Sequence, residues 1–325
     1  SARTAPFSRR SGFSEVAMND TSNRLAVTLG PLSLRNPVIA ASGTFGYGVE
    51  YADIMDISRL GAISVKGISL APRPGNPPPR ICETPAGMLN SIGLANVGYD
   101  VFVSSYLPRL RALNATVIVN TYGTSAAEFA ELAQRFDAEA GVAALEVNIS
   151  CPNVKAGGIH FGVSGKPAAE VTAAVRKKTR LPVIVKLSPE AADIAEVAKA
   201  VEGAGADAVS LINTFKGMSI DVETRRPRLG VGFGGLSGPA IRPLAVRMVY
   251  QVHRAVQIPV IGMGGIVCLR DVLEFLLAGA AAVQVGTASF ASPIAMIDII
   301  EDLQKYCDAR QLVPGDLVGG VQMPS

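Results

Sequence analysis

The sequence contains little cysteine and no tryptophan. Only four cysteines occur among 325 residues, and Cys82, Cys151, Cys268 and Cys307 are too far apart to form a CxxC pair. We therefore expect neither a disulfide framework nor a metal site, and a reducing, cytoplasmic compartment fits the chain best. Cys82, Cys268 and Cys307 are predicted to be small buried hydrophobic residues.

Charge of either sign is also scarce. Charged residues make up 18% of the chain and the net charge is +3, against a usual charged share of about 25%. So small an excess of positive charge indicates no nucleic-acid-binding face. The hydrophobic share of 49% excludes a disordered chain, because enough apolar surface is available to offset the entropy lost on folding.

No uninterrupted hydrophobic run is long enough to cross a membrane, and no membrane association is expected. The uncharged stretch 275–297 comes closest, but Gly279, Gly286 and Pro293 interrupt it. We interpret it as a helix end, a buried strand, a loop and the start of another helix. Ser292 is predicted to cap that last helix, with Pro293 in its first turn.

Residues 1–23 differ from the rest of the chain, since they contain Arg3, Arg9, Arg10 and several serines but no apolar periodicity. We expect a flexible extension or vector-derived segment ahead of a native start at Met18. An Arg- and Ser-rich transit peptide is the alternative. Residues 24–325 are predicted to form a single domain.

Eight short apolar runs alternate with segments of helical periodicity. Nearly continuous apolar runs are typical of parallel strands that are covered on both faces. The runs are 38–41, 62–65, 116–120, 145–149, 182–187, 208–213, 259–263 and 282–285. Residues 193–201 are predicted to be helical, with their apolar side chains on one face. Eight β/α units predict a closed (β/α)8 TIM barrel rather than a doubly wound sheet, because no GxGxxG follows the first strand.

Two long inserts interrupt this pattern, at residues 69–95 and 216–237. They follow the second and sixth strands, so they are predicted to be inserted loops at the C-terminal face of the barrel. Loops of this length in a compact domain are usually functional.

Polar residues gather where the predicted strands end, and barrel enzymes build their sites at these ends. Lysine and asparagine are costly to bury, so several at one face predict a site for a polar planar ligand. These residues are Lys66, Asn120, Asn148, Lys186 and Asn213.

Glycines follow the seventh and eighth strands, as Gly264–Gly265 and Gly286–Thr287. Glycine lets backbone N–H groups approach a phosphate, and a following helix N-terminus adds a favourable dipole. Tight turns alone would explain either position. Together they favour a phosphorylated cofactor.

Cys151 is set apart from the other cysteines because it lies in an irregular polar segment, Asn148–Asn153, just beyond the fourth strand. A thiol at this face can act as a nucleophile or as a general base. His160 is near enough in sequence to form a Cys–His pair, although no third member is indicated. His253 is predicted to be a surface or packing residue.

The motifs together resemble dihydroorotate dehydrogenase, and they occur in barrel order over residues 25–306. They are AASGTFGYG (40–48), SVKG (64–67), PRPGNPPPRICETPAGMLNSIGLANVG (72–98), EVNISCPNVKAGG (146–158), VKLSP (185–189), INTFKGM (212–218), GGLSGPAI (234–241), GMGGI (262–266) and VQVGTA (283–288). The GNPPPR insert, and the cysteine rather than serine after NIS, make the chain similar to the class 1B catalytic subunit.

The resemblance implies oxidation of dihydroorotate to orotate in pyrimidine biosynthesis, a CH–CH oxidoreductase reaction with FMN as cofactor and Cys151 as the general base. It implies substrate contacts from Lys66, Asn90, Ser91, Ile92, Gly93, Leu94, Asn148, Asn213 and Thr214. It implies FMN contacts from Ser42, Lys66, Gly67, Asn120, Asn148, Lys186, Ile212, Gly238, Gly264, Gly265, Gly286 and Thr287.

The resemblance further implies a homodimer of this chain and an electron-transfer subunit with FAD and a [2Fe-2S] cluster, which delivers electrons to NAD⁺. The chain itself has no dinucleotide fingerprint, and its cysteines lack the spacing of a Cys₄ cluster. The alternatives are a class 1A-like enzyme that uses fumarate and a dihydropyrimidine dehydrogenase-type flavin barrel, which usually reads SCPH where this chain has SCPN. A non-flavin phosphate-binding lyase or isomerase, and a binding subunit without turnover, also stay open.

Overall fold

The centre of the computed structural model, which describes residues 24–150 and 161–324, is a closed barrel of parallel strands. Neighbours around the barrel follow the order β10-β15-β16-β3-β4-β7-β8-β9. The barrel strands are β3 (Val38–Ala40), β4 (Ala62–Ser64), β7 (Val117–Thr121), β8 (Val142–Asn148), β9 (Val183–Lys186), β10 (Ala208–Leu211), β15 (Val260–Met263) and β16 (Ala282–Val285). The predicted (β/α)8 barrel and all eight predicted strands are confirmed.

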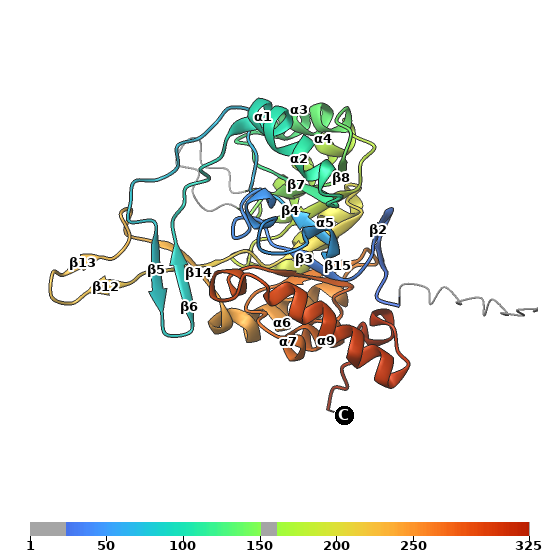
Figure 1. Ribbon diagram of the computed structural model, residues 1–325. Helices are drawn as coiled ribbons and strands as arrows, with labels where there is room; N and C mark the ends of the chain where they lie inside the picture. Colours follow the sequence, from blue (N-terminus) through green and yellow to red (C-terminus); the bar gives the residue numbers. More distant parts are fainter. Residues whose placement is uncertain (1–23, 151–160, 325) are drawn as a thin grey trace, which may run out of the picture.

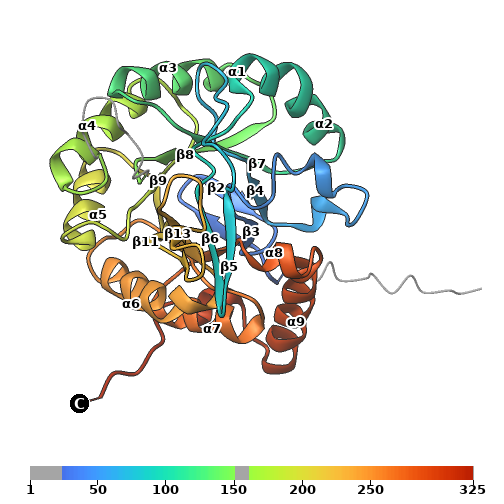
Figure 2. The same ribbon diagram turned by 90° about the vertical axis from the view of Figure 1, so that its left-hand side faces the viewer.

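Helices surround the barrel as an outer ring (Figure 2). The outward side chains of the strands pack against the apolar faces of these helices in one large core. The helices are α1 (Gly98–Val101), α2 (Leu107–Ala112), α3 (Ala126–Asp137), α4 (Gly165–Arg176), α5 (Ile194–Gly203), α6 (Arg242–His253), α7 (Leu269–Ala278), α8 (Ala288–Ala291) and α9 (Ala295–Arg310). A π-helical segment, Phe102–Tyr106, joins α1 to α2, and 3-10 turns cover Val49–Tyr51, Ile57–Arg59, Pro239–Ile241 and Pro314–Leu317.

Inward side chains of the strands form layers, because alternate residues of a strand point to the same face. The lowest layer is apolar and includes Ile118, Ala144 and Ile184. A hairpin of β1 (Val27–Leu29) and β2 (Leu32–Leu34) packs its leucines against this layer. The described residues thus close the barrel at its N-terminal end and leave the opposite end open.

The two inserts meet at that opposite end and form one antiparallel sheet, in the order β11-β14-β6-β5 (Figure 1). The first insert supplies β5 (Ile81–Thr84) and β6 (Gly87–Asn90), and the second supplies β14 (Gly234–Ser237), which pairs with β6 and with β11 (Phe215–Gly217). Loops were predicted here, and the difference arises because each insert provides hydrogen-bonding partners for the other.

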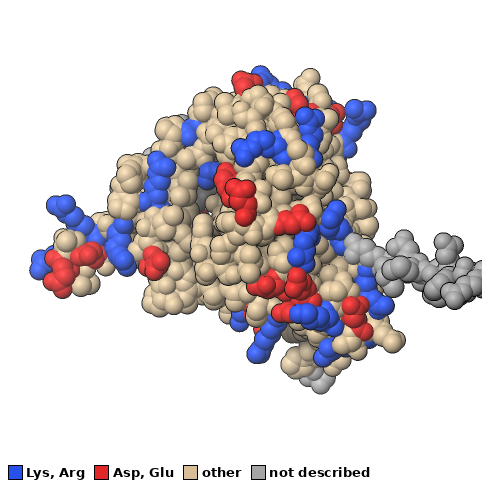
Figure 3. Space-filling model, in the orientation of Figure 1, with Lys and Arg blue, Asp and Glu red and all other residues tan. Residues whose placement is uncertain are grey.

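A narrow hairpin of β12 (Ile220–Asp221) and β13 (Arg226–Pro227) projects beyond this sheet. Its tip carries side chains of both charges (Figure 3). Over the face shown in Figure 3, basic and acidic residues are mixed. This mixture agrees with the small net charge.

The uncharged stretch 275–297 divides as predicted among α7, β16, α8 and the start of α9. The capping prediction for Ser292 is wrong. The short helix α8 ends at this residue, and α9 begins only at Ala295, with Ile294 at its N-cap. No helix within residues 24–150 and 161–324 is long and apolar enough to span a membrane.

Cysteine burial follows the prediction at two of the three positions that the structure describes. Cys82 and Cys307 are buried, whereas Cys268 is exposed. Cys268 differs because it is the N-cap of α7, where the chain enters the helix at the surface. His253 is a packing residue, as predicted, since its ring lies against Gly279 and Gly319.

Candidate functional site

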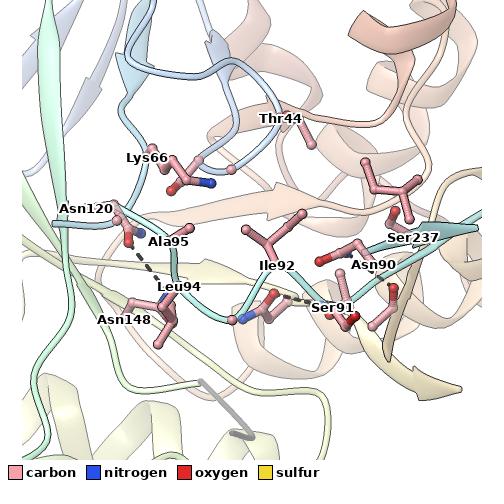
Figure 4. Close-up of a pocket in the computed structure, with 18 of the residues that line it drawn as sticks. Thr44, Lys66, Asn90, Ser91, Ile92, Leu94, Ala95, Asn120, Asn148 and Ser237 are labelled. Atoms are coloured by element: carbon pink, nitrogen blue, oxygen red, sulfur yellow. Dashed lines mark hydrogen bonds between the residues drawn. The ribbon is translucent and has the colours of Figure 1, made fainter. Parts of the chain in front are cut away.

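A cavity lies between the C-terminal ends of the barrel strands and the insert sheet (Figure 4). Most of the predicted site residues line it. They are Ser42, Lys66, Gly67, Asn90, Ser91, Ile92, Gly93, Leu94, Asn120, Asn148, Lys186, Asn213 and Thr214. The strand-end pattern and the family resemblance therefore predicted residues from distant segments that the fold brings together around one space.

Six predicted residues lie outside the wall of this cavity, namely Ile212, Gly238, Gly264, Gly265, Gly286 and Thr287. Several of them adjoin it. Thr287 Oγ1 lies 2.8 Å from Oγ of Ser237, which is itself a cavity residue. Gly265 has a φ of 76°, and a Cβ there would lie 2.8 Å from the carbonyl oxygen of Gly238. Glycine is therefore required where these two segments approach each other.

Cys151 and His160 lie outside the described residues. The described part of the same motif reaches the cavity, because Asn148 lines it and the side chain of Asn213 donates to Ser150 Oγ at 2.7 Å. Ser150 Oγ in turn donates to Asn148 Oδ1, also at 2.7 Å.

Lys66 brings a positive charge into the cavity wall from the segment after β4. Burial lowers the pKa of this lysine, the nearby Arg80 lowers it further, and Glu50 acts in the opposite direction. Among the residues that the structure describes, no carboxylate forms an ion pair with Lys66. A half-buried cation of this kind favours an anionic group on the ligand.

A polar layer lies directly below the cavity, one layer above the apolar residues of the barrel interior. At its centre is Glu146 of β8, which is fully buried. Glu146 Oε1 accepts hydrogen bonds from Ser210 Oγ at 2.8 Å and from Gln284 Nε2 at 2.6 Å. Its Oε2 accepts from Ser64 Oγ at 2.8 Å and from Asn120 Nδ2 at 2.6 Å.

The environment of Glu146 favours its ionised form. Burial raises the pKa of its carboxyl group, but the charge of Lys186 and the hydrogen bonds from its neighbours outweigh burial, so that the pKa lies below its usual value. Lys186 Nζ is 3.8 Å from Oε2, and its side chain is 6% exposed. Glu146 thus places a negative charge in the barrel interior, and Lys186 places a positive charge at the cavity wall.

The polar layer connects to the cavity through Asn120. This side chain donates to Glu146, and its Oδ1 accepts a long hydrogen bond of 3.5 Å from Asn148 Nδ2. A hydrogen-bonded chain therefore runs from the barrel centre through Asn120 and Asn148 to Ser150 and Asn213. Figure 4 shows Asn120 and Asn148 facing each other beside Lys66.

Sequence reasoning missed part of the cavity and most of the polar layer. The missed cavity residues are Gly43, Thr44, Ile81, Met88, Ala95, Gly235, Ser237 and Phe290, and the missed polar residues are Glu146, Ser64, Ser150, Ser210 and Gln284. A signal for the polar layer was present, because single polar residues interrupt otherwise apolar strands, as in AIS, LEVN, AVSL and AVQV.

The cavity combines amide groups, two lysines and open backbone, a set suited to a polar ring with a negative charge. Ser91 contributes a buried Oγ that has no hydrogen-bond partner among the described residues. Gly43 has a φ of 93° and open space where a Cβ would stand. A ligand can therefore approach the backbone closely at this point.

Comparisons with known proteins agree with one another. The family model described as dihydroorotate dehydrogenase matches residues 24–307. The catalytic subunit of dihydroorotate dehydrogenase B (NAD(+)) from Desulforamulus reducens is 58% identical over 87% of this chain and 93% of the relative. The subunit of the same name from Trichlorobacter lovleyi is 56% identical, and that from Geobacter sp. is 57% identical. Each of these two comparisons covers 92% of this chain and 98% of the relative.

Proposed function

Because the chain belongs to the dihydroorotate dehydrogenase family, we propose that its cavity binds dihydroorotate against FMN and that the protein oxidises it to orotate for pyrimidine biosynthesis. The names of the relatives agree with the predicted class 1B catalytic subunit. The observation that carries the proposal is the convergence of Lys66, the asparagines and the NSIGL segment of the first insert on one cavity.

The described residues fit FMN and substrate at adjoining positions. Gly264, Gly265, Gly286 and Thr287 would bind the phosphate through backbone N–H groups, as glycines after the last strands of a barrel commonly do. Ser42, Gly67, Asn120, Asn148 and Lys186 would contact the flavin ring, with Ile212 and Gly238 beside it. Lys66, Asn90, Ser91, Ile92, Gly93, Leu94, Asn148, Asn213 and Thr214 would surround dihydroorotate.

The reaction removes a proton from C5 of dihydroorotate and a hydride from C6, leaving the double bond of orotate. FMN, when bound, supplies the acceptor for the hydride. Cys151 would take the C5 proton as a thiolate. Asn148 and Asn213 would orient the ring by pairing with its amide groups. Lys66 would stabilise negative charge on the substrate, and the insert sheet would exclude water.

Purification of the full chain followed by a ligand titration tests the proposal. The protein should be yellow, and mass measurement of the extracted flavin should identify FMN, because the chain has no Rossmann signature to bind the adenine half of FAD. Orotate should perturb the flavin spectrum at far lower concentration than uracil does.

Other outcomes would point to the alternatives. A colourless protein would indicate the non-flavin barrel or the binding subunit, and preference for uracil would indicate a dihydropyrimidine dehydrogenase-type enzyme. FAD as the major flavin would contradict the proposed cofactor.

The proposal includes a homodimer of this chain in the cytoplasm, with an electron-transfer subunit that carries FAD and a [2Fe-2S] cluster. It rests on the class of the relatives and, for the compartment, on the free thiols of Cys82, Cys268 and Cys307. We expect the isolated chain to reduce dyes with dihydroorotate but to reduce NAD⁺ negligibly until the partner subunit is added.

The rates of dye reduction and NAD⁺ reduction by dihydroorotate, measured at equal flavin concentrations without and with the partner subunit, test this expectation. Fumarate serves as the control acceptor, because a class 1A-like enzyme would reduce it without a partner. Robust NAD⁺ reduction by the chain alone, or fumarate turnover that matches the dye, would contradict the class assignment while leaving the dihydroorotate chemistry intact.

A further inference from the structure

The buried carboxylate of Glu146 lies one layer below the proposed FMN site, and the proposed chemistry does not use it. Among the described residues, its hydrogen bonds and its ion pair come from side chains of the barrel strands β4, β7, β9, β10 and β16. A fully buried anion costs free energy unless it is balanced. Glu146 is balanced by four hydrogen bonds and by Lys186.

We propose that Glu146 is a positioning residue that balances the charge of Lys186 and orients Asn120 at the floor of the cavity, and that through them it sets the affinity and the reduction potential of bound FMN. This inference rests on the proposed function, because Lys186 and Asn120 face the flavin only if the cavity binds FMN.

Lys186 depends on Glu146 for its counter-charge. Its side chain is almost fully buried, and among the described residues Glu146 is the carboxylate within ion-pair distance. The other charged group in the same cavity wall is the cation Lys66, and Glu190, which follows β9, pairs instead with Lys216 at 3.7 Å. The neighbours Ser64, Asn120, Ser210 and Gln284 are not titratable.

Asn120 depends on Glu146 for its orientation. An anionic carboxylate accepts hydrogen bonds only, so it fixes the Asn120 amide with Nδ2 turned inward and Oδ1 turned toward Asn148 and Gly67. The cavity therefore receives an acceptor from Asn120 and a positive charge from Lys186, an asymmetric pair suited to a flavin ring edge.

The test compares Glu146→Gln, Lys186→Met and the double variant with the parent, using the full chain. We expect Glu146→Gln to weaken FMN binding about tenfold, as loss of a charged hydrogen-bonded contact does. In the Lys186→Met background the same change should have less effect, because one of the two groups through which Glu146 acts is gone and only Asn120 is left. A purely structural role would instead weaken binding equally in both backgrounds.

The potential of bound FMN gives a readout that loss of stability would not move. The two single variants should shift it in opposite directions. Lys186→Met should make it more negative, because a cation stabilises the reduced flavin more than the oxidised form, and Glu146→Gln should make it more positive, because the anion that offsets this cation is removed. If the affinity for reduced FMN falls tenfold more than the affinity for oxidised FMN, the reduction potential falls by about 30 mV. An unchanged or more negative potential in Glu146→Gln would overturn the proposal.

Urea unfolding without FMN separates this inference from the proposed function. Removing one partner of a buried pair destabilises a protein more than removing both, so Glu146→Gln should have a lower urea midpoint than the double variant. The reverse order would overturn the inference. A parent that binds no FMN would overturn the proposed function, and the unfolding order would still decide whether Glu146 balances Lys186.

Asp207→Asn is the matched control. Asp207 Oδ2 pairs with Arg176 Nη1 at 2.9 Å and accepts from the backbone of Val183 at 2.8 Å, at the N-terminal end of the barrel strands. This change removes a paired carboxylate far from the cavity. It should lower the urea midpoint and leave the affinity and the potential of FMN at the parental values.

Discussion

Replacing Cys151 by alanine is expected to slow reduction of bound FMN by dihydroorotate about 10²–10⁴-fold, the usual cost of losing a positioned general base. Alanine cannot take the C5 proton, whereas every residue proposed to contact FMN is unchanged, so the FMN content should be unchanged. Single-turnover reduction, followed by loss of flavin absorbance, measures the effect. The parental rate should rise with pH as the thiol ionises, and the rate of Cys151→Ala should lack that dependence.

Cys268→Ala is the control for this experiment. Cys268 is exposed at the N-cap of α7 and lines no part of the cavity, so its replacement should leave the reduction rate at the parental value. A Cys151→Ala protein that reduces its flavin within about threefold of the parent would contradict the assignment, since that is below the range for a general base.

Lys66→Met is expected to raise the dissociation constant of orotate about 10–10²-fold, because a hydrogen bond between charged groups in a half-buried site contributes roughly 1.5–3 kcal/mol. Methionine keeps most of the apolar stem of lysine and removes only the charge. Equilibrium titration of FMN-loaded protein with orotate measures the change.

The pH dependence of orotate binding provides a second check on Lys66. Burial and Arg80 hold the pKa of this lysine below its usual value. Parental affinity should therefore be greatest below that lowered pKa and fall as pH rises through it, whereas Lys66→Met should lack this component. Lys216→Met is the control, because Lys216 pairs with Glu190 outside the cavity wall. Equal losses in both variants would argue against a specific contact by Lys66.

The barrel and the rim of its site could be predicted from the sequence because both follow from local pattern. Parallel strands buried on two faces are nearly continuous apolar runs, and their polar ends meet at one rim, so Lys66, Asn120 and Asn148 could be assigned together. The glycines after β15 and β16 were predicted in the same way, and they lie outside the cavity wall.

Other features depend on contacts between segments that are distant in sequence. Glu146 is acceptable in an apolar strand only because four other strands provide hydrogen bonds and a fifth provides Lys186. Ser292 has the chemistry of a helix cap, but the short helix α8 precedes it and shifts the start of α9. Neither the burial of Glu146 nor the start of α9 can be derived from the few residues that flank it in the sequence.

The pairing of the two inserts has a consequence for the order of folding. The hydrogen bond from Asn90 Nδ2 to the carbonyl of Gly235 joins residues that are 145 positions apart, and a two-stranded hairpin alone is marginally stable in water. Contacts this distant in sequence form late, because much of the chain must be ordered before they repay its entropy. We therefore expect the barrel to close before β6 and β14 pair. The insert side of the cavity is completed last, so that ligand binding reports on a chain that has finished folding.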